Sequence, residues 1–209
     1  SMNSIAEALG MSLTGGAIIP APYKQREIIS FKTGKRIVEM VHEDLVPSKI
    51  MTKEAFENAI YVASAIGASS NCPPHLTAIA RHMGIDLNIE TWEKLGHNIP
   101  LLVNCQPAGE HLMEGFFRAG GIPAIMQELM KNNKLHKNVM TVTGKTVEEN
   151  LNIKINTDEN VIKSFKNPLV KNAGFIVMKS NFFSSAVMKT SVISKEFRKR
   201  YLSNPKNPN

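Results

Sequence analysis

The chain has 209 residues, of which 43% are hydrophobic and 21% are charged, and its formal net charge is +7. This composition is typical of a soluble globular protein, and no apolar run approaches the ~20 residues that cross a bilayer, which argues against a membrane partner. Two cysteines are too few for a disulfide framework, so the sequence predicts a cytoplasmic location.

The positive charge is concentrated in the last quarter of the chain. Residues 160–209 contain ten lysines or arginines and one acidic residue, whereas residues 1–159 contain 15 basic and 17 acidic residues. Basic charge without interleaved aromatic platforms or a recognisable reading motif is weak evidence for nucleic acid. The sequence therefore favours a solvated basic face and no nucleic-acid partner.

Helical patterns dominate the first part of the chain. Ile37, Val41 and Leu45 repeat every four residues, and we expect Pro47 to end that helix because proline blocks its continuation. Thr52 is the expected N-cap of the next helix. Its apolar stripe comprises Phe56, Ala59, Ile60, Ala63 and Ile66. A third stripe, ended by glycine, comprises Leu76, Ile79, Ala80 and Met83.

Short apolar runs alternate with these helices. Residues 99–105 (IPLLVNC) indicate a buried strand, and residues 120–133 indicate a helix with Pro123 in its first turn. Residues 139–146 (VMTVTGKT) indicate another short strand followed by a turn. This alternation predicts a layered α/β domain.

The charge balance changes sign within a polar, irregular segment over residues 152–168. Beyond it, residues 174–183 and 186–192 indicate strands, and residues 194–202 indicate a short basic helix. We therefore predict one domain over residues 1–160, then a linker and the start of a second domain over residues 161–209. The mid-helix beginning and the turn-forming end (SNPKNPN) predict that this sequence is an internal piece.

The stretch GASSNCPPHLTAIARHMG places more polar groups ahead of a helix than one N-cap requires. Ser69, Ser70 and Asn71, together with the free N–H groups of a helix start, form a general recipe for holding a carboxylate or phosphate. The alternative is a capped helix start without a ligand. The spacing alone leaves both interpretations open.

Cysteine and histidine positions permit two further interpretations. Cys72 lies three residues before His75, and Cys105 and His111 lie further along the chain. A metal site needs at least three such ligands at suitable spacing, and a nucleophilic Cys72 needs a lowered pKa. Buried thiols fit better than either, because no C-x-x-C pair is present. The glycine pairs in LTGGA and RAGGIP match no nucleotide-binding motif and indicate tight turns.

Longer stretches of the sequence resemble a known family. MNSIAEALGMSL, GASSNCPPHLTAIARHMGIDL, PLLVNCQPAGEHL and FRAGGIPAIMQEL resemble, in this order, the dihydroxy-acid and sugar-acid dehydratases. NCQPAGEHLMEGFFRAGG and NFFSSAVMKTSVISKEFRKRYLSNP are most similar to the aldonate branch, the pentonate dehydratases that act on xylonate or arabinonate. The resemblance covers nearly the whole chain.

This resemblance implies a hydro-lyase that converts a sugar acid to a 2-keto-3-deoxy acid. A 2Fe-2S iron–sulfur cluster would act as Lewis acid on the C3 hydroxyl, Mg²⁺ would orient the substrate, and a serine would remove the C2 proton. It also implies the later part of a three-layer α/β/α domain, followed by the opening strands of a β-barrel-like domain. The full enzymes of the family form dimers or tetramers, so a homo-oligomer is expected.

The resemblance places the cofactor ligands and the catalytic serine outside this sequence, so the fragment alone is expected to be inactive. Cys72 and Cys105 do not correspond to cluster ligands. What remains is a substrate-facing rim, where the family has a GGSTN loop followed by a histidine. The corresponding residues are Ser69, Ser70, Asn71 and His75. Thr14 to Gly16 would form a second rim loop.

Two alternatives remain open. The first is a dihydroxy-acid dehydratase of branched-chain amino-acid synthesis, which has the same chemistry with a different substrate. The second is a non-catalytic α/β binding module with a basic tail.

Overall fold

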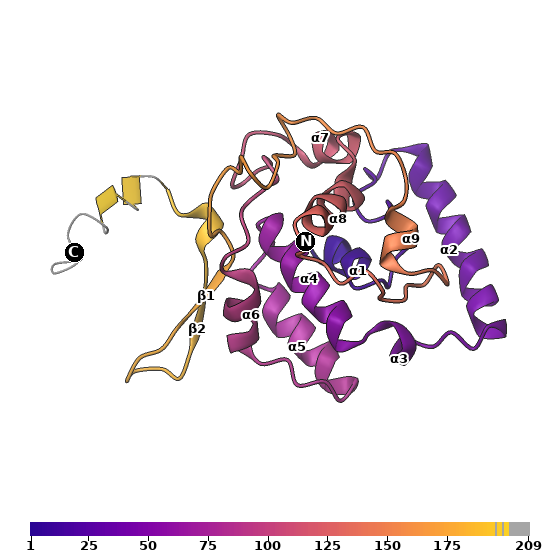
Figure 1. Cartoon of the computed structure of the whole chain (residues 1–209), viewed down its shortest axis with the longest axis horizontal. Helices are drawn as coiled ribbons and strands as arrows, with labels where there is room; N and C mark the ends of the chain where they lie inside the picture. The colour runs from indigo at the N-terminus through magenta and orange to yellow at the C-terminus, as the bar shows by residue number, and fades with distance from the viewer. Residues whose placement is uncertain (195, 198, 201–209) are drawn as a thin grey trace.

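The computed structural model describes residues 1–194, 196–197 and 199–200. This part of the chain is mostly helical and contains one small sheet (Figure 1). Its elements are α1 (Met2–Ala8), α2 (Lys24–His42), α3 (Pro47–Ile50), α4 (Lys53–Ala65), α5 (Cys72–His82), α6 (Ile89–Gly96), α7 (Met113–Arg118), α8 (Gly121–Lys131), α9 (Val147–Leu151), β1 (Phe175–Met178), β2 (Ala186–Lys189) and the 3-10 turn η1 (Thr190–Val192). The basic helix expected over residues 194–202 extends outside the described residues.

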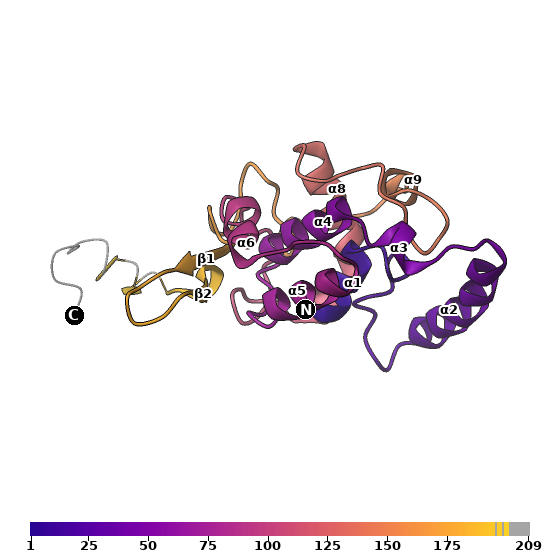
Figure 2. The ribbon, with the colours of Figure 1, turned by 90° about the horizontal axis from the view of Figure 1, so that it is seen from below.

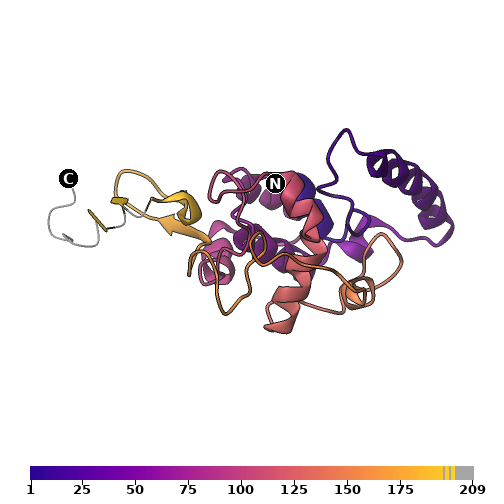
Figure 3. The same cartoon turned by 90° about the horizontal axis from the view of Figure 1, so that it is seen from above.

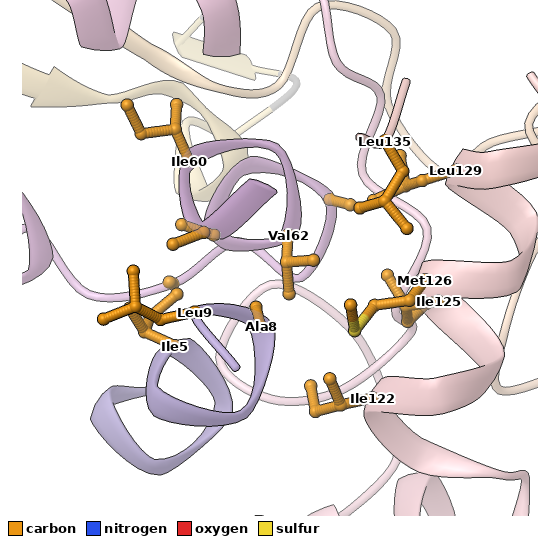
Figure 4. Close-up of a cluster of buried hydrophobic side chains, with 14 of the residues drawn as sticks. Ile5, Ala8, Leu9, Ile60, Val62, Ile122, Ile125, Met126, Leu129 and Leu135 are labelled. Carbon is orange, nitrogen blue, oxygen red and sulfur yellow. The ribbon is translucent and has the colours of Figure 1, made fainter. Parts of the chain in front are cut away.

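Helix α4 forms the centre of the hydrophobic core, and nine of its 13 residues are buried. The predicted N-cap is confirmed, because Thr52 Oγ1 accepts a hydrogen bond from the Ala55 amide at 3.4 Å. The predicted apolar stripe is buried along α4, with Ile66 half-buried at its end. Figure 4 shows side chains of α1, α4 and α8 meeting there, among them Ile5, Leu9, Ile60, Val62, Ile125 and Leu129.

Two further helix predictions are confirmed. Helix α5 is followed by Gly84 in a left-handed conformation with φ of +69°, as a C-terminal stop requires. Helix α8 has Pro123 in its first turn, where the missing N–H group has no intrahelical partner to lose.

Strands β1 and β2 lie in the two apolar runs that predicted strands, and they pair as an antiparallel hairpin with Phe175 opposite Lys189. The hairpin docks on α6. The rings of Trp92 and Phe175 meet edge to face with centroids 5.3 Å apart, and Glu93 Oε1 accepts a hydrogen bond from the Val177 amide at 3.2 Å. Helix α6 packs on α4, so the core fixes the position of the hairpin.

The strand expected over residues 99–105 is buried and extended, but it pairs only through isolated bridges. Leu101 bridges Val170, and Val103 bridges Ile162, both antiparallel. The two bridges are thus two residues apart in the segment 101–103 but eight residues apart in the segment 162–170. The residues between Ile162 and Val170 therefore loop away from the pair, and a continuous ladder of hydrogen bonds cannot form.

The three-layer α/β/α arrangement and the barrel-like second domain are not found in the described residues, where β1 and β2 form the sheet. The strand expected over residues 139–146 contributes one bridge. These extended segments find hydrogen-bond partners in helix ends and loops. The Leu102 amide donates to Ala65 O, and the Val142 amide donates to Gly10 O, both at 2.8 Å. The expectation of helices combined with short strands is therefore confirmed, while the three-layer domain and the barrel-like domain stay predictions for the intact protein.

Helix α2 differs from expectation in two respects. It ends at His42, and Pro47 begins α3, because a proline in the first turn of a helix loses no hydrogen bond. The apolar residues of its repeat do not pack into the core, since Ile37 is 54% and Val41 is 74% exposed. Figures 2 and 3 show α2 standing off the main body, at the end opposite the β1–β2 hairpin.

Two glycines permit close contacts on the two sides of α6, Gly174 with the residues that precede β1 and Gly96 with α4. A Cβ atom on Gly174 would lie 2.0 Å from the carbonyl oxygen of Gly96, and a Cβ atom on Gly96 would lie 2.5 Å from Ser64 Oγ. Neither position has room for a side chain.

We expect Gly174→Ala to lower the free energy of unfolding by about 1–3 kcal/mol, because the added methyl group overlaps a backbone carbonyl. Urea unfolding followed by circular dichroism measures this loss. Gly115→Ala is the matched control, since its Cβ atom would meet only His111 Cβ at 3.7 Å, an ordinary contact. Equal stability of the two variants would contradict the close packing.

Candidate functional site

A pocket of about 340 Å³ lies where α1, the α4–α5 loop, the segment around residues 103–108, α7 and β2 meet. Its volume is at the lower end of the ~300–1,000 Å³ range of small-molecule sites. Its polar lining includes Ser4, Ser69, Ser70, Gln106 and Lys189. Its apolar wall includes Val103, Met113 and Phe116. Several hydroxyls and the lysine ammonium group therefore face a partly apolar space.

The α4–α5 loop is held in place by hydrogen bonds from backbone amides to serine hydroxyl oxygens. The Ser69 amide donates to Ser1 Oγ at 3.0 Å, and Ser69 Oγ accepts from the Asn71 amide at 3.2 Å. Asn71 is the N-cap of α5, but its φ of −73° and ψ of −19° are helical and its side chain accepts no capping hydrogen bond. The Asn71 side chain is therefore not used to cap the helix.

The structure brings together only some of the predicted rim residues. Ser69 and Ser70 both line the pocket. Asn71 and His75 are exposed and do not line it. The described residues thus put the two hydroxyls, but not the amide or the imidazole, on this pocket.

Lys189, at the end of β2, lines the same pocket and was missed by the sequence analysis. Burial lowers the pKa of its ammonium group, while the Cys72 thiol acts in the opposite direction. Among the described residues, no carboxylate lies within ion-pair distance of it. A cation that is partly withdrawn from water and unpaired gains strongly from an anionic ligand. The predicted strand contained Lys189, but its alternation could not indicate which residue faces a pocket.

The two cysteines are buried, and burial raises the pKa of both thiols. A raised pKa opposes the thiolate form that attacks substrates and binds metals. Within the described residues, no group of three or more His, Cys, Asp or Glu side chains is arranged to hold a metal ion. These residues therefore do not fit an iron–sulfur cluster or a magnesium ion.

The second expected rim loop, Thr14 to Gly16, lies away from this pocket, next to the buried carboxylate of Glu7. Thr14 and Glu7 line a separate small cavity. Glu7 accepts hydrogen bonds from the amides of Gly15 at 2.6 Å and Ala17 at 2.8 Å. Burial raises the pKa of Glu7 to about 7, although both hydrogen bonds act to lower it. The carboxylate thus holds the loop on α1.

Residues 1–150 match the sequence profile described as dihydroxy-acid/6-phosphogluconate dehydratase, N-terminal. This match covers more than half of the chain, so the chain belongs to this family.

Individual relatives narrow the comparison. Over 205 residues, or 98% of the chain, it is 52% identical to D-xylonate dehydratase of Caulobacter vibrioides. It is 45% identical to L-arabinonate dehydratase of Rhizobium leguminosarum bv. trifolii over 90% of the chain, and 43% identical to dihydroxy-acid dehydratase of Acetivibrio thermocellus over 94%. The aligned part is 34%, 33% and 36% of these relatives, respectively, so the chain spans about a third of their length.

Among the described residues, no helix is both long and apolar enough to cross a membrane.

The buried carboxylate of Glu7 predicts a pH-dependent stability. Its pKa is raised from 4.5 to about 7, so the folded state binds a proton more tightly than the unfolded chain does. This contribution to stability is complete below pH 4.5 and is lost as the pH rises through 7. Glu7→Gln mimics the protonated acid, so the stability of the native protein relative to this variant should fall by up to about 3 kcal/mol between pH 5 and pH 8.

Urea unfolding of both proteins at the two pH values measures this difference. Parallel pH profiles of the two proteins would contradict the raised pKa.

Proposed function

We propose that the intact protein is a hydro-lyase that dehydrates a pentonate, of the xylonate or arabinonate type, to a 2-keto-3-deoxy acid. The observation that carries this proposal is the ranking of relatives. Identity is 52% and 45% with the two pentonate dehydratases, and 39–43% with the relatives named dihydroxy-acid dehydratase.

The pocket supports this substrate class. A pentonate carries one carboxylate and several hydroxyl groups. Lys189 offers a partly desolvated cation for the carboxylate, and Ser69, Ser70 and Gln106 offer hydrogen-bonding groups for the hydroxyls. In this proposal the chain's own residues bind and orient the substrate. Asn71 and His75 stay predicted substrate contacts on the resemblance alone.

The iron–sulfur cluster and magnesium ion are proposed for the intact enzyme, with ligands outside these 209 residues. When bound, they would supply Lewis-acid assistance to the loss of hydroxide. The cytoplasmic location stays a prediction, as do the two-domain division at residues 160–161 and the homo-oligomer.

A substrate panel tests the function. We expect the intact, cofactor-loaded enzyme to form 2-keto acid from D-xylonate or L-arabinonate with a kcat/KM at least tenfold above that for a branched 2,3-dihydroxy acid. Trapping the keto product with semicarbazide measures the rate. The reverse preference would assign the protein to branched-chain synthesis, and no turnover of either class would favour a binding module.

Replacement of Lys189 tests the site. Loss of a charge-assisted contact costs about 1.5–3 kcal/mol, so Lys189→Met should reduce kcat/KM for the pentonate at least tenfold. Lys179→Met is the matched control in the same hairpin, because Lys179 is exposed and pairs with Glu90 at 2.8 Å. Its kcat/KM should stay within about twofold of the native value. If both variants lose activity equally, the effect belongs to the hairpin and not to the pocket.

A further inference from the structure

Gly67 follows the C-cap of α4 and begins the loop that carries Ser69 and Ser70. Its φ of +59° is left-handed, and the residue lines the candidate pocket. A Cβ atom on Gly67 would lie 3.0 Å from Leu101 Cδ1 and 3.0 Å from Ser191 Oγ. The backbone of the loop is therefore held between the segment around residue 101 and the 3-10 turn η1.

Lys189 reaches this contact from the hairpin. It is half-buried and immediately precedes η1, whose residues Thr190 and Ser191 are each 5% exposed. Thr190 Oγ1 donates a hydrogen bond to the carbonyl oxygen of Gly174 at 2.7 Å, which ties η1 to the residues before β1. Ser191 therefore lies between the loop, at Gly67, and the strand end that carries the lysine.

The Ser191 hydroxyl has no hydrogen-bond partner within the described residues. A buried hydroxyl without a partner costs free energy, so alanine would suit the fold better at this position. Stability alone therefore does not explain the serine. Its Oγ atom instead contacts the backbone of Gly67, which lines the pocket. We call this the Gly67–Ser191 contact.

We propose that Ser191 is a positioning residue, and that the Gly67–Ser191 contact sets where Lys189 lies relative to the hydroxyls of Ser69 and Ser70. A displacement of about 1 Å can weaken a reaction about a hundredfold, because binding groups must converge on one ligand. For its ligand the proposal rests on the proposed function, since a pentonate is the anion that these groups would bind. The environment of Lys189 can be measured without that ligand.

Gly67→Ala tests the contact in the intact, cofactor-loaded enzyme, with D-xylonate or L-arabinonate as substrate. The added methyl group pushes Ser191 away from the loop, so KM should rise about fivefold or more while kcat per folded molecule stays within about twofold. Gly84→Ala is the matched control. Gly84 also has a left-handed φ, of +69°, but a Cβ atom there would meet nothing within 4 Å. Its KM should stay within about twofold of the native value.

Rescue separates the contact from general damage to the core. Ser191→Ala removes the oxygen that the new methyl group meets and leaves Ser191 Cβ at 3.4 Å, an ordinary contact. Its addition to Gly67→Ala should therefore lower KM again by about threefold or more. An unchanged KM in Gly67→Ala, a loss confined to kcat, or the absence of rescue each overturns the proposal.

The pKa of Lys189 tests the contact without substrate. Burial lowers this pKa, so movement of η1 away from the loop should raise it toward the ordinary lysine value. The pH dependence of acetylation by acetic anhydride, followed by peptide mass spectrometry, measures this pKa, with the exposed Lys179 as internal reference. A rise in Gly67→Ala and none in Gly84→Ala is expected. Equal values in both variants overturn the proposal.

Two further outcomes are distinguishable. If Gly67→Ala does not fold, Ser191→Val crowds Gly67 from the other side with an ordinary backbone and should raise the pKa of Lys189 and KM in the same way; native values of both overturn the proposal. If the native enzyme turns over no pentonate, the proposed function fails, and the pKa of Lys189 alone decides whether the Gly67–Ser191 contact positions this residue.

Discussion

The burial of α4, nine of whose 13 residues are buried, is the constraint on which the rest of the structure depends. Helices α1, α6 and α8 pack against it, and α6 in turn carries the β1–β2 hairpin through Trp92 and Phe175. The contacts from Ser64 to Gly96 and from Gly96 to Gly174 are so close that not even a methyl group fits between α4, α6 and the residues before β1. The loop that follows α4 carries Ser69 and Ser70, while the hairpin carries Lys189. The hydroxyls and the cation therefore reach one pocket from segments more than a hundred residues apart, because both segments rest on the same core.

The electrostatics of this pocket favour an anion over a metal or a nucleophile. A thiolate needs stabilisation by water or by nearby positive charge, yet burial is the largest effect on Cys72 and Cys105 and raises the pKa of both. Lys189 needs negative charge nearby, since its ammonium group has lost part of its hydration and has no ion-pair partner in the described residues. A ligand carboxylate would be attracted to this ammonium group, whereas a metal cation would be repelled by it.

The sequence predicted the helices of the core well because their apolar periodicity records burial directly. The predicted helix signals are found in place: the N-cap Thr52, the buried stripe along α4, the C-terminal stop Gly84 and the first-turn proline Pro123. Residues 99–105 show the limit, since a buried apolar run indicates an extended segment but not whether its neighbours form a ladder. Of the polar residues on the candidate pocket, Ser69 and Ser70 belong to a cluster that can be recognised along the chain, and their role in substrate binding stays a prediction. Lys189 reaches the pocket because its hairpin packs on α6, and the spacing of neighbouring residues in the sequence does not indicate such a long-range contact.

Helix α2 shows why periodicity alone cannot identify the partner of an apolar face. The repeat of Ile37 and Val41 indicated a helix, and the fold leaves both side chains in contact with solvent. Helices depend for most of their stability on packing of their apolar face, and α2 is attached to the body mainly by Arg26 and Arg36. Because these side chains are only partly exposed, full burial of each one would supply a part of the about 1.5–3 kcal/mol that burying a fully exposed apolar side chain gives. The repeat thus identifies the helix but not the contacts of its apolar residues, which depend on how the rest of the chain packs around α4.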